Sequence, residues 1–343
     1  HAPCVAPEWN LASRPMARVF SGIQPSGELH LGNYLGAVKT WVDLQSQHDC
    51  IFCVVDLHAI TQSYEPGALA ARTLEMAIGL MACGLDPDRC TLFVQSHVPE
   101  HSELNWLLNT VAPLGELERQ TQFKDKSQKQ ESIPAGLLNY PVLQAADILL
   151  YHATLVPVGE DQVQHLELSR EIARRWNARF KAGFFAEPQP LLSKAKRVLG
   201  LDGQAKMSKS LGNTIGLFDS PEVIWEKLRP AATDPARKTR KDPGNPDICN
   251  IFTLHQGFSS AETQQDVAQK CRTAGWGCLD CKRVLADNMI AALAPIRERA
   301  AELRAHPERV QEALRAGAHK AQKIASGTLA DVRSAMGFMP PGA

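Results

Sequence analysis

Short, β-branched apolar segments alternate with longer helical patterns over residues 16–212, and this alternation restricts the possible folds more than any other feature. The apolar segments occupy residues 18–20, 51–55, 91–94 and 153–158, and one of the helical patterns covers residues 69–83. Alternation of this kind predicts an α/β fold of the Rossmann-like class, with a mainly parallel sheet covered by helices. Ligands of such sheets bind beyond the carboxyl ends of the strands, so site residues are expected there.

After residue 213 the strand signals fade, and the rest of the chain has the pattern of amphipathic helices. One apolar face comprises Leu285, Met289, Leu293, Ile296 and Leu303, and a second comprises Val310, Leu314, Ile324 and Val332. Pro295 lies within the first run, so a kink or a short break is expected there. A length of 343 residues suits two domains. The predicted division is an extension at 1–15, the α/β domain at 16–212 and a helical domain at 213–343.

Composition limits the kinds of partner. Lys and Arg together number 37, as do Asp and Glu, so only local clusters can attract a nucleic acid. No apolar stretch approaches the ~18 residues needed to cross a bilayer, which predicts a soluble protein without membrane contact. Nine cysteines in a chain without a secretion signal favour reduced thiols or metal ligands and a cytoplasmic setting.

Three glycines, Gly22, Gly27 and Gly32, occur where the first strand should turn into a helix. Glycine there permits a close approach between the backbone and a phosphate, and a helix N-terminus favours an anion. His30 and Asn33 add neutral donors that can stabilise charge developing on a phosphate. The segment matches neither of the two common glycine-rich nucleotide motifs, and a purely structural turn is the alternative.

A second motif, Lys206-Met207-Ser208-Lys209-Ser210, is flanked by glycines that can act as hinges. Two lysines three residues apart can meet a pyrophosphate as it gains charge in a transition state. A solvated basic turn is the simpler interpretation of a lysine pair alone. The joint occurrence of both motifs favours nucleotide chemistry.

His30, Gly32 and Asn33 after a first strand, with the lysine motif about 175 residues later, resemble the two signatures of class I aminoacyl-tRNA synthetases. The surrounding sequence resembles the tryptophanyl-tRNA synthetases over residues 16–338, most clearly at 21–34, 56–61, 115–119, 121–126, 140–151 and 156–168.

The resemblance implies a domain that binds ATP and tryptophan, with the helical domain binding the anticodon of tRNA(Trp). The tryptophan carboxylate would attack the α-phosphate of ATP to give tryptophanyl-adenylate and pyrophosphate, with Mg²⁺ sharing the phosphate charge. A ribose hydroxyl of the tRNA would then take the acyl group. Members of this family are usually homodimers.

Matching positions assign the site residues. The expected catalytic groups are His30, Asn33, Lys126, Lys206 and Lys209. The expected ATP contacts, besides Asn33, Lys206 and Lys209, are Gln24, Pro25, Ser26, Gly32, Gly159, Glu160, Asp161, Val198, Met207, Ser208 and Ser210.

Tyr140, Gln144 and Asp147 are spaced to share one face of a helix, and we interpret that face as the amino-acid pocket. An indole N–H only donates, so a buried carboxylate such as Asp147 is a suitable reader. A charge or cap at a helix end is the structural alternative for Asp147. Other residues expected to contact tryptophan are Phe20, Gln24, His58 and Gln162.

Gln144 departs from the methionine that many tryptophan enzymes have, and the Tyr140, Gln144 and Asp147 face also resembles tyrosyl-tRNA synthetases. A phenol both donates and accepts, so a tyrosine-specific enzyme on the same scaffold is an alternative. A further alternative is a paralogue whose main role is binding another protein.

Cys249, Cys271, Cys278 and Cys281 have the spacing C-x21-C-x6-C-x2-C, which suits zinc or a [4Fe-4S] cluster. Some bacterial tryptophanyl-tRNA synthetases carry a similar pattern that holds a [4Fe-4S] cluster, with a first gap one residue longer. Four metal-free thiols are the alternative. The remaining cysteines are expected to be small buried hydrophobes: Cys4, Cys50, Cys53, Cys83 and Cys90.

Overall fold

A five-stranded parallel sheet forms the centre of the protein. The structure is a computed structural model that describes residues 16–128, 132–159, 162–192 and 198–340. It does not describe the side chains of Lys126 and Ser210. The strands are β1 (Arg18–Ile23), β2 (Asp49–Val54), β3 (Thr91–Val94), β4 (Leu155–Val158) and β5 (Gln189–Leu192), and their order is β3-β2-β1-β4-β5. The four predicted strands are confirmed. The fifth was missed because Gln189–Leu192 is short and contains a proline, which is tolerated at a sheet edge.

The strand order reverses between β1 and β4, which lie side by side although about 130 residues separate them. The loops that follow these two strands therefore leave the same edge of the sheet in opposite directions and open a crevice between them. Residues 24–30 follow β1, and Gly159 follows β4. The fold thus places both segments at the expected ligand site. Glu160 and Asp161 lie outside the described residues.

Helices cover both faces of the sheet, because successive strand residues point to opposite sides. Val19 packs in one apolar cluster with α2 (Lys39–Leu44) and α4 (Pro66–Ala82), whereas Phe20 packs in the other. Helices of the second face are α5 (Glu100–Asn109), α8 (Ala135–Leu149) and α9 (Val163–Arg179). Short helices join these elements: α1 (Leu31–Asn33), α3 (Asp56–Ala59), α6 (Leu114–Glu118) and α7 (Thr121–Ser127).

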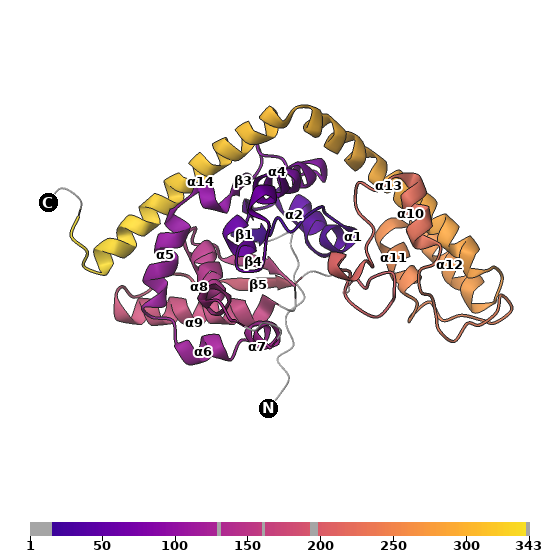
Figure 1. Ribbon diagram of the computed structural model, residues 1–343, viewed down its shortest axis with the longest axis horizontal. Coiled ribbons are helices and arrows are strands. Elements are labelled where there is room, and N and C mark those ends of the chain that lie inside the picture. The colour runs from indigo at the N-terminus through magenta and orange to yellow at the C-terminus, as the bar shows by residue number, and fades with distance from the viewer. Residues whose placement is uncertain (1–15, 129–131, 160–161, 193–197, 341–343) are drawn as a thin grey trace.

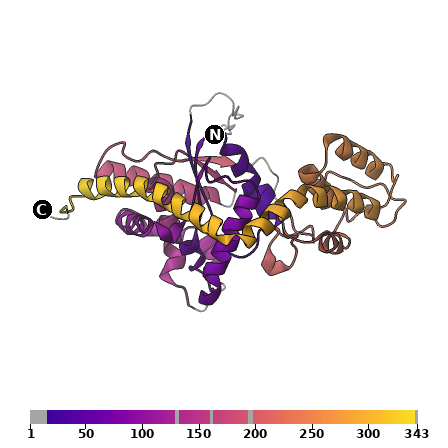
Figure 2. The same cartoon turned by 90° about the horizontal axis from the view of Figure 1, so that it is seen from above.

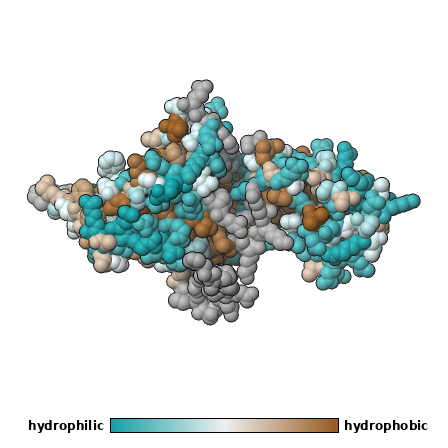
Figure 3. Space-filling model, turned by 90° about the horizontal axis from the view of Figure 1, so that it is seen from below, coloured by the Kyte–Doolittle hydropathy of each residue, from teal (hydrophilic) through white to brown (hydrophobic). Residues whose placement is uncertain are grey.

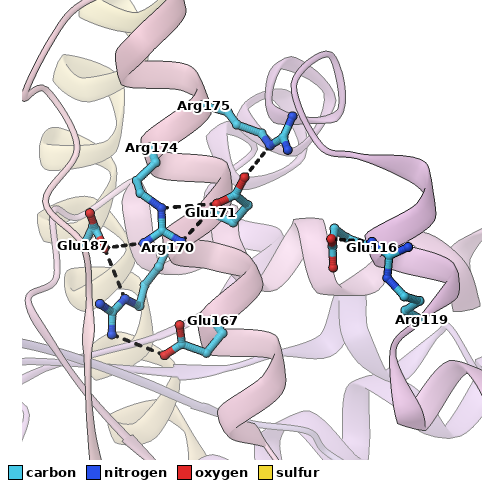
Figure 4. A network of polar contacts seen from close by, with 8 residues as sticks. All are labelled: Glu116, Arg119, Glu167, Arg170, Glu171, Arg174, Arg175 and Glu187. Carbon is cyan, nitrogen blue, oxygen red and sulfur yellow. Dashed lines mark hydrogen bonds and ion pairs between the residues drawn. The ribbon is translucent and has the colours of Figure 1, made fainter. Parts of the chain in front are cut away.

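Ion pairs fix the edge strand β5 to helix α9. Arg170 and Arg174 both contact Glu187, two residues before β5, at 3.3 and 2.7 Å (Figure 4). Glu171 in turn pairs with Arg174 at 3.0 Å and Arg175 at 2.6 Å. Exposed pairs contribute little individually, so their effect here is to orient the segment that leads into β5.

The predicted helical region comprises α10 (Pro221–Leu228), α11 (Asn250–Phe258), α12 (Ala261–Arg272), α13 (Cys278–Ala305) and α14 (Pro307–Ala335). Figures 1 and 2 show α13 and α14 as two long helices that meet at an angle, with α10, α11 and α12 gathered at the far end of α13. The two predicted apolar faces are buried, although Ile324 is only half-buried. No break occurs at Pro295, because burial on both sides of the proline holds α13 continuous.

Helix α14 returns to the sheet and lies against β3 (Figure 1). The approach is so close that a Cβ built on Gly317 would lie 1.9 Å from the carbonyl oxygen of Leu92. The last helix therefore packs on the α/β core as well as continuing the helical region, and the division at residue 212 stays a prediction. Within the described ranges, no helix is both long and apolar enough to cross a membrane.

Candidate active site

The loop after β1 ends at His30, which caps the short helix α1. The backbone N–H of Gly32 donates to Nδ1 of His30 at 3.1 Å, and the N–H of His30 donates to Oδ1 of Asn33 at 3.2 Å. Because Nδ1 accepts a hydrogen bond, the neutral ring carries its proton on Nε2. His30 therefore offers a donor of the kind the sequence predicted; the Gly32 N–H orients the ring, and Asn33 holds the backbone of His30.

The two sequence motifs lie together. A Cβ built on Gly27, whose φ is +120°, would lie 2.7 Å from Nζ of Lys209, and one on Gly32 would lie 3.3 Å from Cβ of Met207. The segments next to the two motifs are also in contact, since Leu31 donates its N–H to the carbonyl of Ile215 at 3.0 Å. Glycine at position 27 is needed for both the backbone conformation and the close approach of the ammonium.

Positive charge accumulates where the motifs meet. Burial, then Lys209 and Lys206, lowers the pKa of His30 to about 4. The pKa of Lys209 is itself lowered by burial and by Arg72, while Glu28 acts in the opposite direction. An imidazole that stays neutral beside two ammonium groups donates without adding repulsion, and an anion would relieve the repulsion among the cations.

Asn213 gives a defined shape to the loop that carries the motif Lys206-Met207-Ser208-Lys209-Ser210, called the lysine loop below. Its buried side chain accepts the N–H of Ser208 at 2.8 Å and donates to Asp202 at 3.0 Å. Val198 accepts the N–H of Met207 at 3.3 Å, and both side chains are buried. Asn213 and Asp202 were not predicted, because they bind the loop from outside its motif.

A cavity beside the first motif is lined by three of the expected ATP contacts, Gln24, Pro25 and Ser26. Arg72 of α4 lines the same cavity. Sequence reasoning missed this cation because a single arginine within an amphipathic helix belongs to no motif.

Asp147 lies deep in the core on α8, with 2% of its surface exposed. Its carboxylate accepts three side-chain hydrogen bonds, from His58 Nε2 at 2.7 Å, Gln95 Nε2 at 2.7 Å and His101 Nδ1 at 2.6 Å. Burial alone would raise the pKa of Asp147, but the charges and hydrogen bonds of His58 and His101 outweigh it and hold the pKa well below its ordinary value. The alternative of a helix cap is wrong, because side chains rather than helix-end N–H groups donate to the carboxylate.

One acceptor position of the carboxylate is not used by any described residue. Oδ1 accepts from Gln95 and His101, whereas His58 is the one described donor to Oδ2. A carboxylate offers about four acceptor positions, so Oδ2 has one left. That position suits a ligand with a lone N–H.

Tyr140 lies on the same helix, and its hydroxyl is 2.7 Å from Nε2 of His165. Its ring meets the ring of His58 edge-on, with centroids 6.2 Å apart. The predicted face is thus formed, with His58 touching both Tyr140 and Asp147, while Gln144 is half-buried. Tyr140 and Leu143 also line an adjacent groove of about 980 Å³.

Phe20 and Gln162 were also expected to contact tryptophan, and each has contacts of its own. Phe20 is buried and stacks on Tyr151, with ring centroids 5.6 Å apart. Gln162 directly precedes α9 and donates its backbone N–H to the carbonyl of Gly159 at 3.0 Å. Gln95, His101, Tyr151 and His165 were not assigned roles from the sequence, because they join the site from distant parts of the chain.

The four cysteines of the helical region gather around the ends of three helices. Cys249 precedes α11, Cys271 ends α12, and Cys278 and Cys281 begin α13. Burial raises the pKa of the Cys281 thiol to about 12, and the charges of the other three act in the same direction. In the described part of the chain, no three metal-binding side chains lie close enough together to form a ready metal site.

The other described cysteines behave as expected. Cys50, Cys53, Cys83 and Cys90 are buried, and burial raises the pKa of each. They act as small hydrophobic residues, and Cys4 lies outside the described residues.

Comparison with known proteins agrees with this geometry. The profile of the family "tRNA synthetases class I (W and Y)" matches residues 13–294. A tryptophan--tRNA ligase of Deinococcus radiodurans is 54% identical over 329 residues, covering 94% of this chain and 99% of the relative. A tryptophan--tRNA ligase of Parasynechococcus marenigrum is 49% identical over 332 residues, covering 94% and 98%. The crystal structure of a Campylobacter jejuni tryptophanyl-tRNA synthetase with ADP and tryptophan superposes with a TM-score of 0.84 at 37% identity, covering 94% of this chain and all of that one.

Proposed function

We infer that this chain, which belongs to the class I tRNA synthetases of the tryptophan and tyrosine group, is a tryptophan--tRNA ligase. It activates tryptophan with ATP to tryptophanyl-adenylate and pyrophosphate, and then transfers the acyl group to tRNA(Trp). The observation that carries this function is the contact between the two signature motifs, with Lys209 against Gly27 and Met207 against Gly32. The identity of the relatives favours tryptophan over the tyrosine alternative.

In the proposed mechanism, the triphosphate lies between the first motif and the lysine loop. The substrate carboxylate attacks the α-phosphorus, the bond to the bridging oxygen breaks, and charge accumulates on the leaving pyrophosphate. Nε2–H of His30 and the ammonium groups of Lys206 and Lys209 stabilise that charge, with Mg²⁺ sharing it. Asn33 holds the backbone of His30, and the Gly32 N–H keeps the ring in place. Lys126 is assigned to pyrophosphate by its sequence position alone.

Gln24, Pro25 and Ser26 are proposed to contact the nucleotide, since they line the cavity beside these groups. The remaining contacts are assigned from sequence positions: Gly32, Gly159, Glu160, Asp161, Val198, Met207, Ser208 and Ser210. Arg72 joins them as a cation facing the same cavity.

Asp147 is proposed to read the indole N–H. His58 and His101 keep the carboxylate ionised, Gln95 helps to fix it, and among the described residues one acceptor position on Oδ2 is unused. Indole fits this position because it donates one hydrogen bond and accepts none. His58, Tyr140 and Gln144 form the surroundings of that position, and the pyrophosphate-binding groups lie beyond the end of β1.

An amino-acid screen by pyrophosphate exchange tests the proposed function. Exchange of labelled pyrophosphate into ATP should depend on tryptophan, with tyrosine giving at most about a hundredth of that rate, because a site built for one hydrogen-bond pattern rejects others strongly. Exchange with tyrosine and none with tryptophan would establish the alternative substrate. No exchange with any amino acid would favour the protein-binding paralogue.

We further propose a cytoplasmic homodimer. Ile60 and Tyr64 line the groove of about 980 Å³, together with Asn105, Ser132 and Pro134, which flank the exposed Trp106 and Ile133 in the sequence. Large apolar side chains grouped on a monomer surface mark an interaction site. A second copy of the chain would cover this surface next to the Tyr140 face. The helical region is proposed to bind the tRNA anticodon.

For the four cysteines, we propose a [4Fe-4S] cluster. Cys249 and Cys278 both act electrostatically on the thiols of Cys271 and Cys281, which supports the four cysteines as neighbours that could hold one cluster. Gly244 permits this packing, since a Cβ there would lie 2.7 Å from Sγ of Cys271. Arg237 adds a positive charge beside the thiols. A bound cluster would link α11, α12 and α13 covalently.

Iron and acid-labile sulfide should be present in equal amounts, about four of each per chain, in protein purified without oxygen. Cys278→Ser should lose both, whereas the buried Cys83→Ser should retain them. Zinc alone, or no metal, would reject the cluster.

A further inference from the structure

Two side chains of the helical region hold the base of the lysine loop. Asn250, the first residue of α11, is buried and donates from Nδ2 to the carbonyl of Gly200 at 2.8 Å. Lys282 of α13 is also buried, and its ammonium donates to the carbonyls of Arg229 at 2.7 Å and Ala231 at 2.6 Å. Both polar groups are shielded from water, and their hydrogen-bond partners lie outside their own helices.

The contacts of Lys282 continue to the loop through one further hydrogen bond. Directly after Ala231, the N–H of Ala232 donates to the carbonyl of Leu201 at 2.7 Å. Gly203, with a φ of +67°, packs on the same alanine, since a Cβ there would lie 3.3 Å from that of Ala232. Two adjacent loop carbonyls, at Gly200 and Leu201, are therefore held from the helical region.

Gly200 and Leu201 in turn hold the segment that carries Lys206 and Lys209. The N–H of Gly200 donates to the carbonyl of Ala205 at 2.8 Å, and Leu199 pairs with Lys206 in an antiparallel bridge. The N–H of Leu201 donates to the carbonyl of Asn213, whose side chain holds Ser208. A shift at the base of the loop therefore moves the segment that carries Lys206 and Lys209.

Burying an ammonium or an amide is costly unless its polar atoms are hydrogen-bonded. Asn250 also leaves its Oδ1 buried without a partner among the described atoms, so the side chain is oriented by its one contact with the loop. This cost is understandable if the contact serves the ATP site rather than the packing of α11.

We propose that Asn250 and Lys282 are positioning residues for the lysine loop, which hold it where its ammonium groups meet the pyrophosphate. The proposal rests on the proposed function of that loop. Asn250 directly follows Cys249, and Lys282 directly follows Cys281.

The test compares two asparagines of the helical region. Asn250→Ala removes the contact with Gly200, whereas Asn288→Ala removes an equivalent amide contact, with Ser259 Oγ at 2.9 Å, that does not touch the loop. Pyrophosphate exchange gives KM for ATP, KM for tryptophan and kcat. Hydrogen exchange measures the protection of backbone amides at residues 200–203.

Asn250→Ala should lower kcat/KM for ATP by about tenfold or more, since misplacing a catalytic group by about 1 Å can cost a factor of 100. KM for tryptophan should stay within about twofold, and the amides at 200–203 should exchange faster. Asn288→Ala should leave all of these unchanged. Lys282→Met should act like Asn250→Ala, and Lys282→Arg should restore part of the loss.

Equal behaviour of Asn250→Ala and Asn288→Ala would overturn the proposal, as would a parallel loss in the ATP and tryptophan parameters. If Lys282→Met does not fold, the asparagine pair decides alone. Failure of the proposed function looks different, because the unmodified protein would then show no tryptophan-dependent exchange.

Discussion

Asp147 and His30 show how buried polar residues acquire specific roles from their neighbours. Asp147 stays ionised in the core because of the charges and hydrogen bonds of His58 and His101. His30 stays neutral because it is partly buried beside Lys206 and Lys209. In both residues the surroundings favour the protonation state that the proposed role requires.

Asp147→Asn should raise KM for tryptophan by about 100-fold and KM for ATP by less than about threefold. The amide presents an N–H₂ group where an acceptor is required, so an indole donor loses its partner and the surrounding donors are left unsatisfied. The exposed Asp88→Asn is the matched control and should be silent. Equal increases in both KM values would show that Asp147 serves only the fold.

His30 should titrate near pH 4, whereas an ordinary histidine titrates near 6.5. Its folded pKa lies below the unfolded value, so the unfolded chain binds more protons between those two limits. The contribution of His30 to stability is therefore complete above pH 6.5 and falls as the pH drops toward 4. NMR titration of ring protons, assigned with His30→Gln, measures this. A midpoint near 6.5 would contradict the burial of the ring beside the lysines.

At the scale of elements, sequence patterns predicted β1 to β4, the helix that carries Asp147 and both buried faces of α13 and α14. Periodicity reports which side of an element is buried, so these predictions were accurate. The partners of Asp147 were not predicted, because Gln95 and His101 approach it from other elements and no local pattern links them. Asn213, which shapes the lysine loop, was missed for the same reason.

The contact between α14 and β3 gives a prediction at this scale. Gly317→Ala should lower the free energy of unfolding by about 2–4 kcal/mol, because the new methyl group collides with the backbone of Leu92 and the helix must move. Gly327→Ala on the same helix has open space around it and should stabilise by about 0.5–1 kcal/mol. Denaturant unfolding measures both. Stabilisation by Gly317→Ala would show that the helix does not approach the strand so closely.

For the molecule as a whole, α13 and α14 join the helical region to the α/β core that holds the proposed nucleotide site and the proposed amino-acid pocket. The face shown in Figure 3 is largely hydrophilic, with separate apolar patches rather than one continuous apolar surface among the coloured residues. The groove lined by Ile60 and Tyr64 is the surface on which the proposed homodimer depends.

Light scattering should therefore give the mass of a dimer. Trp106→Glu should weaken association by at least about tenfold, because it places a charge where an apolar side chain, 71% exposed in the single chain, would be covered. The control Leu279→Glu changes an exposed leucine at the other end of the molecule and should leave the dimer intact. A monomeric unmodified protein would reject the interface.

The most direct measurement is a crystal structure with tryptophan and a non-hydrolysable ATP analogue bound together. The triphosphate should lie between His30 and Lys209, and the indole N–H should face Oδ2 of Asp147. A triphosphate bound away from the contact between the first motif and the lysine loop, or an indole bound far from Asp147, would contradict the assignment of the active site.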